Sequence, residues 1–477
     1  MAKEKESSAK PRDPVCPIEF RYGRTEARAI FTREATLGRY LQVESALANA
    51  LAAAKVIPRE AAQDIASAVD GGKVSLARVD ELEALTRHDV MALVRALSEV
   101  AGKGAPYVHL GATSNDILDT ARGLELKEAC ALLRGSLTLL LLRLAEEAER
   151  HKGTPMVGRT HGQHAVPTSL GYKLATFLAE FVRHRQRLDA MMDRLAVGKM
   201  AGAVGTGASF ALTVGGGQGD PRKACASAEA IESAVLGSLG LAVDEAPTQI
   251  TGRDRLAEFA FWMAMVASTL DRLATEVRNL QRSEIGELAE PFEEGGQVGS
   301  STMAQKRNPV SSENVSSMAR LLRAIPGPAL ENMVQWHERD LANSANERFL
   351  YSHGVILLDE MIRRMTTIVA GWEANPARMQ HNLDSSGGAV MAEAVMLELT
   401  RRGLARQEAH ELLRNLTRDL KGGEDTLLGR ARLSPVVKRW FKAGELESYF
   451  SPQAYVGAAQ YKTERILHRL NKELKER

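Results

Sequence analysis

The chain has 477 residues, a length that allows about three domains. Lysine and arginine number 62 against 60 aspartates and glutamates, so the net charge is +2 and a dedicated nucleic-acid binder is not expected. Hydrophobic residues make up 44% and charged residues 26%, which excludes a disordered chain, and an aromatic content of only 5% favours helix over strand.

Along the chain, the predicted elements are helices separated by glycine and proline. Shorter helices come first, with breaks at Pro58 and Gly71, and a further break follows Gly371. Between these breaks, three segments that nearly lack glycine and proline predict long helices: Leu124–Lys152, Tyr172–Val197 and Arg253–Ile285. The sequence predicts an all-α fold of three mainly helical domains, residues 18–111, 112–371 (a long-helix bundle) and 372–477, after a disordered tail of residues 1–17.

Two parts of the central region have a distinct pattern. The Gly-rich piece Gly205–Lys223 contains no phosphate-binding motif and is expected to be a flexible loop. In the last long segment, apolar residues recur in steps of three and four, at Leu256, Phe259, Met263, Val266, Leu270, Leu273, Val277 and Leu280. Phe261, Trp262 and Met265 add a second apolar face. This seam needs partner helices, which favours a bundle shared between copies, although a bundle within one chain would also satisfy it.

The cysteines and the apolar stretches indicate the cellular compartment in which the protein is expected. Cys16, Cys130 and Cys225 lie far apart and form no CxxC pair, so neither a disulfide framework nor a Cys-based zinc site is expected. This pattern fits a reducing, cytoplasmic compartment. The most apolar stretch, Phe259–Ala267, is about half the length that spans a bilayer, and no secretory segment is recognised, so no membrane association is expected.

Four polar segments lie at the ends of predicted helices: Thr86–Asp89, His109–Asp116, Gly158–His164 and Gly295–Pro309. In the last, Asn308-Pro309 is typical of a helix N-terminus, and Lys306 just before it favours an anion. A surface loop with a solvated lysine fits the composition equally. Thr113 and Ser114 precede a helix expected from Ile117 and suit a carboxylate or phosphate, with ordinary capping as the simpler interpretation.

Histidines and arginines supply the remaining candidates. His161 and His164 lack a third ligand, so a metal site is not expected. For His161 the more specific hypothesis is a general acid or base, and the alternative is a histidine with a purely structural role. In Trp336–Arg348, two arginines, Arg339 and Arg348, suit a phosphate or carboxylate, with a salt-bridged helix face as the alternative.

Together these segments resemble the fumarase/aspartase superfamily, and more narrowly the adenylosuccinate lyase family. The fourth segment is similar to the superfamily's signature loop, GSSxMPxKxNP. Six other stretches resemble the family in the same order: Arg21-Tyr22, TRHD, HLGATSND, GRTHGQHAVPTSLG, GAVGT and WHERDLANSANER. The resemblance covers about residues 18 to 350 and is weaker beyond.

The resemblance implies a β-elimination that releases fumarate from adenylosuccinate, giving AMP, or from the succinylaminoimidazole-carboxamide ribotide of purine biosynthesis. It implies no cofactor. A base removes a proton beside a carboxylate, and an acid protonates the departing nitrogen. The implied catalytic residues are Ser300 as the base, His161 as the acid, Glu313 supporting His161, Lys306 holding the developing charge and His88 orienting the substrate.

The resemblance also implies how the substrate is bound. Thr113, Ser114 and Gln249 would bind the fumaryl part, and His109 would orient substrate and acid. The nucleotide, chiefly its phosphate, would contact Arg21, Tyr22, Arg339, Ser344 and Arg348. The remaining implied substrate-binding residues are Arg87, Asp89, Ser301, Arg307 and Asn308.

The family completes its active sites with three subunits of a tetramer, so a homotetrameric core is expected. Two positions depart from the family pattern: Ala304 stands where the loop has proline, and Gln305 where the family usually has histidine. Ala304 removes a φ restraint and makes loop closure costlier by about 0.5–1 kcal/mol. The alternatives are a sister activity such as 3-carboxymuconate cycloisomerase, or a catalytically silent homologue.

Overall fold

The computed structural model describes residues 14–215, 220–292, 302–303, 305–420, 423–442 and 444–475. Most of the expected tail, residues 1–13, lies outside this range. The α-helices are α1 Pro17–Phe20, α2 Thr25–Ala29, α3 Arg33–Ala53, α4 Arg59–Asp70, α5 Leu76–Thr86, α6 Asp89–Val100, α7 Ser114–Arg150, α8 Leu170–Leu195, α9 Ala208–Gly215, α10 Pro221–Leu239, α11 Asp254–Leu280, α12 Val310–Ala324, α13 Pro326–Glu331, α14 Ser344–Gly371, α15 Pro376–Asp384, α16 Ala392–Arg402, α17 Arg406–Thr417, α18 Leu427–Leu433, α19 Pro435–Trp440 and α20 Ala459–Lys475.

Short elements complete the fold. The 3₁₀ helices are η1 Gly102–Tyr107, η2 Ala389–Met391, η3 Leu446–Phe450 and η4 Pro452–Tyr455. The strands form three two-stranded sheets, β1 Pro155–Thr160 with β2 Gln163–Ser169, β3 Val197–Gly198 with β4 Ala242–Val243, and β5 Leu288–Ala289 with β6 Glu373–Ala374. The first and third pairs are antiparallel and the second is parallel. The prediction of a mainly helical chain is confirmed, and the three expected long helices correspond to α7, α8 and α11.

The described residues divide into two compact units. The first comprises the described parts of Met1–Ser136, Gln186–Ala267 and Arg320–Glu360, and the second those of Leu137–Arg185, Ser268–Ala319 and Met361–Arg477. The expected three-domain division, with boundaries near Gly111 and Gly371, stays a prediction. In the described parts of the chain, no helix is long and apolar enough to cross a membrane.

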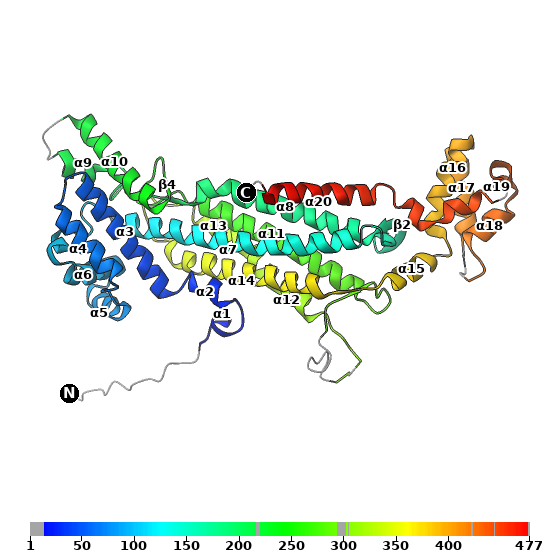
Figure 1. The fold of residues 1–477 in the computed structure, drawn as a ribbon, viewed down its shortest axis with the longest axis horizontal. Coiled ribbons are helices and arrows are strands. Elements are labelled where there is room, and N and C mark those ends of the chain that lie inside the picture. Colours follow the sequence, from blue (N-terminus) through cyan, green and yellow to red (C-terminus); the bar gives the residue numbers. More distant parts are fainter. Residues whose placement is uncertain are drawn as a thin grey trace. The chain divides into compact units, whose positions relative to one another are not determined.

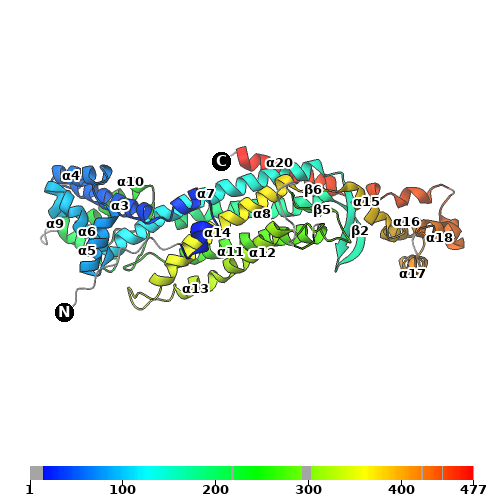
Figure 2. The same ribbon diagram turned by 90° about the horizontal axis from the view of Figure 1, so that it is seen from below.

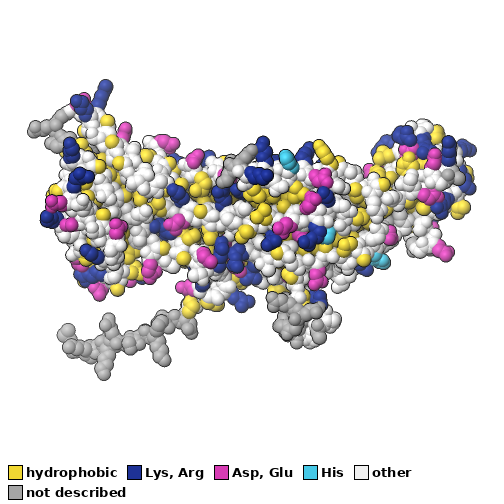
Figure 3. All heavy atoms as spheres, viewed as in Figure 1, with side chains coloured by type: hydrophobic (Ala, Val, Ile, Leu, Met, Phe, Trp, Pro, Cys, Tyr) yellow, Lys and Arg dark blue, Asp and Glu magenta, His cyan; other side chains and the backbone are white. Residues whose placement is uncertain are grey.

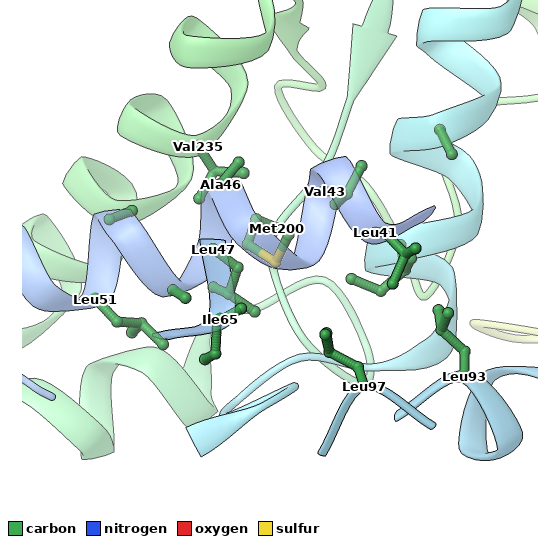
Figure 4. Packing of buried hydrophobic residues seen from close by; sticks show 14 of the residues in the cluster. Leu41, Val43, Ala46, Leu47, Leu51, Ile65, Leu93, Leu97, Met200 and Val235 are labelled. Atoms are coloured by element: carbon green, nitrogen blue, oxygen red, sulfur yellow. The ribbon is translucent and has the colours of Figure 1, made fainter. Parts of the chain in front are cut away.

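The core of the first unit forms where α3 packs on α4 and α10, and α5 on α6 (Figure 1). Figure 4 shows Leu47 and Leu51 of α3 close to Ile65 of α4, with Leu97 of α6 and Met200 nearby. A capping side chain begins α3: the hydroxyl of Thr32 accepts from the amide of Ala35 (3.2 Å).

The loop expected at Gly205–Lys223 is wrong for residues 208–215 and from Pro221 on, while residues 216–219 lie outside the described residues. Ala208–Gly215 forms α9, and α10 begins at Pro221 with the Asp220 side chain accepting from the amide of Arg222 (2.9 Å). α9 contains a single glycine, at its end, and α10 packs against both α9 and α3.

In the second unit, the parts of α8, α11 and α12 that belong to it run alongside one another (Figure 2). Lys173 of α8 pairs with Glu276 of α11 (2.6 Å), and Arg278 of α11 donates to the Ser316 hydroxyl of α12 (3.2 Å). All eight positions of the predicted seam in α11 are at most 6% exposed, so this seam is already buried within one chain. On the second apolar face, Phe261 is 44% and Met265 40% exposed.

Candidate active site

The predicted site residues fall in both units, and each group is described within its own unit. The first unit contains Arg21, Tyr22, Arg87, His88, Asp89, His109, Thr113, Ser114, Gln249, Arg339, Ser344 and Arg348. The second contains His161, Lys306, Arg307, Asn308 and Glu313. Ser300 and Ser301 lie outside the described residues, as does Ala304.

The turn between α5 and α6 presents the first histidine. Arg87 ends α5 with a left-handed backbone (φ 53°), and His88 caps α6, its Nδ1 accepting from the amide of Met91 (3.3 Å). Because Nδ1 is occupied, Nε2 is the ring nitrogen of the exposed His88 that remains for a ligand. Serine, threonine, aspartate and asparagine are the common N-cap residues, so a histidine in this position is unusual.

His109 is also left-handed (φ 62°) and is held by an acid that the sequence analysis missed. The Glu44 carboxylate, 1% exposed, lies 2.6 Å from Nδ1 of His109 and accepts from its backbone N–H (3.2 Å). Left-handed conformations of non-glycine residues are rare and gather at functional sites. Arg87, His109 and His161 all adopt one.

A buried carboxylate organises the segment that follows His109. Asp116 accepts from the amides of Thr113 (2.8 Å), Ala201 (3.0 Å) and Gly202 (3.1 Å) and pairs with the fully buried Lys199. The predicted helix start near Ile117 is slightly late, because α7 begins at Ser114. The Thr113 amide is therefore committed to Asp116 and is not free for a ligand.

Gln249 joins two further stretches of the first unit. Its side-chain amide donates to the carbonyl of Ala203 (2.9 Å), and its backbone N–H donates to that of Glu338 (3.2 Å). Arg21, at the end of α1, is exposed.

The segment Trp336–Arg348 is only partly helical. Its first part, Trp336–Asn343, is a loop, so the alternative of a salt-bridged helix face is wrong there. In this loop the Asp340 carboxylate accepts from the amides of Trp336 (2.7 Å) and Ala342 (2.8 Å).

A cavity of about 500 Å³ in the first unit gathers several predicted residues. Its lining includes Asp89, Arg339, Ser344 and Arg348, contributed by α6, the loop before α14, and α14 itself. One residue of TRHD, Asp89, therefore lines the same cavity as several residues of WHERDLANSANER, although the two segments lie far apart in sequence.

The arginines of this cavity differ in what compensates their charge. Arg253 is buried between two carboxylates, Asp119 (2.8 Å) and Glu347 (2.9 Å). Arg339 donates to the Asn343 side chain (3.2 Å), and its buried Nε has no partner among the described residues. Burial, followed by the charge of Arg253, lowers the pKa of Arg339. The Arg348 guanidinium is exposed and pairs with no described residue. An anion bound here would supply the missing negative charge.

In the second unit, His161 lies at the tip of a β-hairpin and not at a helix end, which corrects the expected placement. Thr160 pairs with Gln163, and His161 (φ 54°) and Gly162 (φ 75°) form a two-residue turn. Such turns require positive φ at both positions, so His-Gly between extended residues was a usable signal. One residue before the pair of Thr160 and Gln163, Arg159 makes two bonds of 2.8 Å to the fully buried Glu287.

The start of α12 also differs from expectation. The Glu290 carboxylate, from the second unit itself, accepts from the amides of Ser311 (3.2 Å) and Ser312 (2.5 Å). The helix begins at Val310, one residue later than Asn308-Pro309 predicted, and Glu290 already supplies a negative charge at this helix end. The exposed Lys306 has no ion-pair partner among the described residues. Arg307 lies over the Phe292 ring (4.9 Å).

Glu313, expected to support His161, is exposed in the first turn of α12. Within the described part of the chain no hydrogen bond joins it to His161. Its supporting role stays a prediction.

Comparison with known proteins decides the family. A family model described as lyase matches residues 19–323, and one described as adenylosuccinate lyase C-terminus matches residues 388–466. Adenylosuccinate lyase of Pyrococcus abyssi is 46% identical over 95% of this chain and 97% of its own, and that of Methanothermobacter thermautotrophicus is 40% identical over 96% and 99%. The chain belongs to the adenylosuccinate lyase family.

Solved structures agree with this family. A fumarate lyase from Mesorhizobium sp. BNC1 has a TM-score of 0.82 at 29% identity, and covers 94% of this chain and 98% of its own. A 3-carboxy-cis,cis-muconate lactonizing enzyme from Pseudomonas putida has the same TM-score and coverage at 32% identity. The match of residues 388–466 extends the adenylosuccinate lyase resemblance beyond residue 350, where the sequence motifs were weak.

Proposed function

We propose that this chain catalyses the β-elimination of fumarate from adenylosuccinate, giving AMP, and from the succinylaminoimidazole-carboxamide ribotide. The observation that carries the proposal is that relatives named adenylosuccinate lyase match nearly the whole chain at up to 46% identity. The cavity lined by Arg339, Ser344 and Arg348 supports it, because its incompletely paired guanidinium groups suit a nucleotide phosphate.

In the proposed reaction, Ser300 removes the proton from the carbon beside a carboxylate, and the electron pair is held as an aci-carboxylate. The bond from the neighbouring carbon to nitrogen then breaks, His161 protonates the departing nitrogen, and fumarate leaves. The Lys306 ammonium stabilises the carbanionic intermediate, because cations prepositioned where charge develops give the largest catalytic term. Lys306 is suited to this role because no described carboxylate neutralises it.

The proposed working form is a homotetramer in which copies complete one another's sites, as the resemblance implies. The exposed apolar side chains of Phe261 and Met265 on α11 support association. Light scattering after size-exclusion chromatography tests this, and a monomer would contradict it. The cytoplasmic location expected from the cysteines stays a prediction.

Two single variants test the assigned chemistry. Ser300→Ala and His161→Gln should each abolish turnover of adenylosuccinate, followed by the absorbance change as AMP forms, while the oligomer stays intact. His164→Gln, three residues from His161 in the same hairpin, is the matched control and should remain active. Near-normal rates in Ser300→Ala or His161→Gln would refute the assigned role.

A second candidate activity is a muconate cycloisomerase, favoured by the 32% identical lactonizing enzyme. The 46% identity to an adenylosuccinate lyase over nearly the whole chain favours the nucleotide enzyme. Incubation with 3-carboxymuconate alongside adenylosuccinate separates the two, and turnover of the muconate alone would reverse the choice.

A further inference from the structure

Glu44 occupies a core position of α3. Together with Leu37, Leu41, Ala48 and Leu51 it follows steps of four and three along one face, and all five are at most 9% exposed. An acid in such a row is costly unless it is paired. Its side chain is only 1% exposed, and a buried acid among leucines therefore points to a specific partner.

That partner is His109. One Glu44 oxygen lies 2.6 Å from Nδ1 of the ring, and the other accepts from the backbone N–H of the same residue at 3.2 Å. In the described part of the chain, these are the only polar contacts of the Glu44 carboxylate. Glu44 thus contacts both the ring and the backbone of a residue whose φ of 62° side chains rarely adopt.

The pairing determines which ring nitrogen is left for a ligand. If Nδ1 carries the ring proton, it donates to one Glu44 oxygen at 2.6 Å while the other oxygen accepts from the backbone N–H, so both oxygens of a carboxylate are satisfied by His109. Nε2 is then the remaining ring nitrogen, on a side chain that is 14% exposed. In the imidazolium form Nε2 is a charged donor, which suits a carboxylate.

We propose that Glu44 is a positioning residue for the lyase reaction, which holds His109 with Nδ1 protonated so that Nε2–H can donate to a substrate carboxylate. Glu44 itself touches no substrate and acts through His109. The inference rests on the proposed function for the identity of the ligand, but the Glu44–His109 coupling can be measured without it.

The electrostatics around His109 agree with this geometry. Burial alone would lower the pKa of His109, but the hydrogen bond and charge of Glu44, with the charge of Asp116, outweigh it, and the pKa is raised. The charge of Glu44 reaches His109 from α3 and that of Asp116 from α7. Asp116 is itself paired with Lys199. Loss of the Glu44 charge should therefore lower the pKa of His109.

The titration of His109 tests the coupling directly. In the full chain labelled with ¹³C at histidine Cε1, His109→Gln identifies the His109 signal among the 11 histidines. In the wild-type chain the pKa of His109 should lie above about 6.5, the value of a free histidine, and in Glu44→Gln it should fall. Glu34→Gln, an exposed acid on the same helix, is the matched control and should leave the titration unchanged.

Turnover supplies the second readout. Glu44→Gln should lower kcat about 10- to 100-fold, less than loss of an acid–base group itself, and shift the pH profile to lower pH. Glu44→Asp keeps the charge and should recover part of both effects, which a purely structural role would not give. If Glu44→Gln does not fold, the titration of His109 in the wild-type chain still tests whether its pKa is raised.

A wild-type His109 that titrates below about 6.5, or an unchanged pKa in Glu44→Gln, would overturn the inference. An inactive wild-type chain whose His109 titrates as expected would instead overturn the lyase assignment, and with it the substrate-facing role of Nε2.

Discussion

Replacing Asp116 by asparagine should strongly destabilise the chain, because it removes the counter-charge of a buried lysine. Asp116 and Lys199 are both fully buried, so neither can regain its hydration in the folded state. Breaking such a pair by removing one partner costs about 3–5 kcal/mol. Asparagine keeps one acceptor oxygen for the three backbone amides that Asp116 now binds, so at least one of those amides also loses its acceptor. The expected cost is a large part of the about 5–15 kcal/mol that stabilises a typical domain.

Urea unfolding followed by circular dichroism measures this cost, at a fixed protein concentration because association adds to stability. Asp80→Asn, in the exposed ion pair with Arg33, is the control and should leave the midpoint nearly unchanged. Adding Lys199→Met to Asp116→Asn should recover much of the loss, since the unpaired charge is then gone. A loss below about 1 kcal/mol in Asp116→Asn would refute the reasoning, because it lies outside the range for a broken buried pair.

Three further predictions follow from single sites. Arg348→Ala should raise KM for the nucleotide substrate more than it lowers kcat, and an unchanged KM would remove Arg348 from the phosphate site. Burial raises the pKa of Glu232, so the folded chain binds its proton more tightly and stability should fall as pH rises above 4.5; Glu232→Gln should flatten that part of the stability curve, and an unaltered curve would contradict this. Burial also raises the pKa of Cys130 to about 12, so a maleimide should label the exposed Cys225 first and Cys130 only after unfolding, and equal rates in the folded chain would argue against its burial.

Long-range periodicity made the helical fold predictable. The seam of α11 and the glycine-poor segments of α7 and α8 depend only on residue spacing, and the structure has all three helices. The charge balance was equally readable, and Figure 3 shows basic and acidic side chains interspersed on the face it draws. The loop expected at Gly205–Lys223 failed because glycine content outweighed a usable signal, Asp220-Pro221 at a helix start.

The site was less predictable, because its geometry depends on residues far apart in sequence. Glu44 is 65 positions from His109, and Asp116 about 85 from the backbone it holds. No local sequence pattern predicts such long-range pairs. Glu290 at the start of α12 illustrates the same point: it accepts from the amides of Ser311 and Ser312, and no local sequence pattern placed this acid at the helix end.

Turnover of adenylosuccinate by the purified wild-type chain tests the central claim most directly. We expect fumarate and AMP to appear in equal amounts at a rate proportional to enzyme concentration, with no added cofactor. A folded, oligomeric chain that binds adenylosuccinate but releases no fumarate would contradict the claim and favour a catalytically silent member of the family.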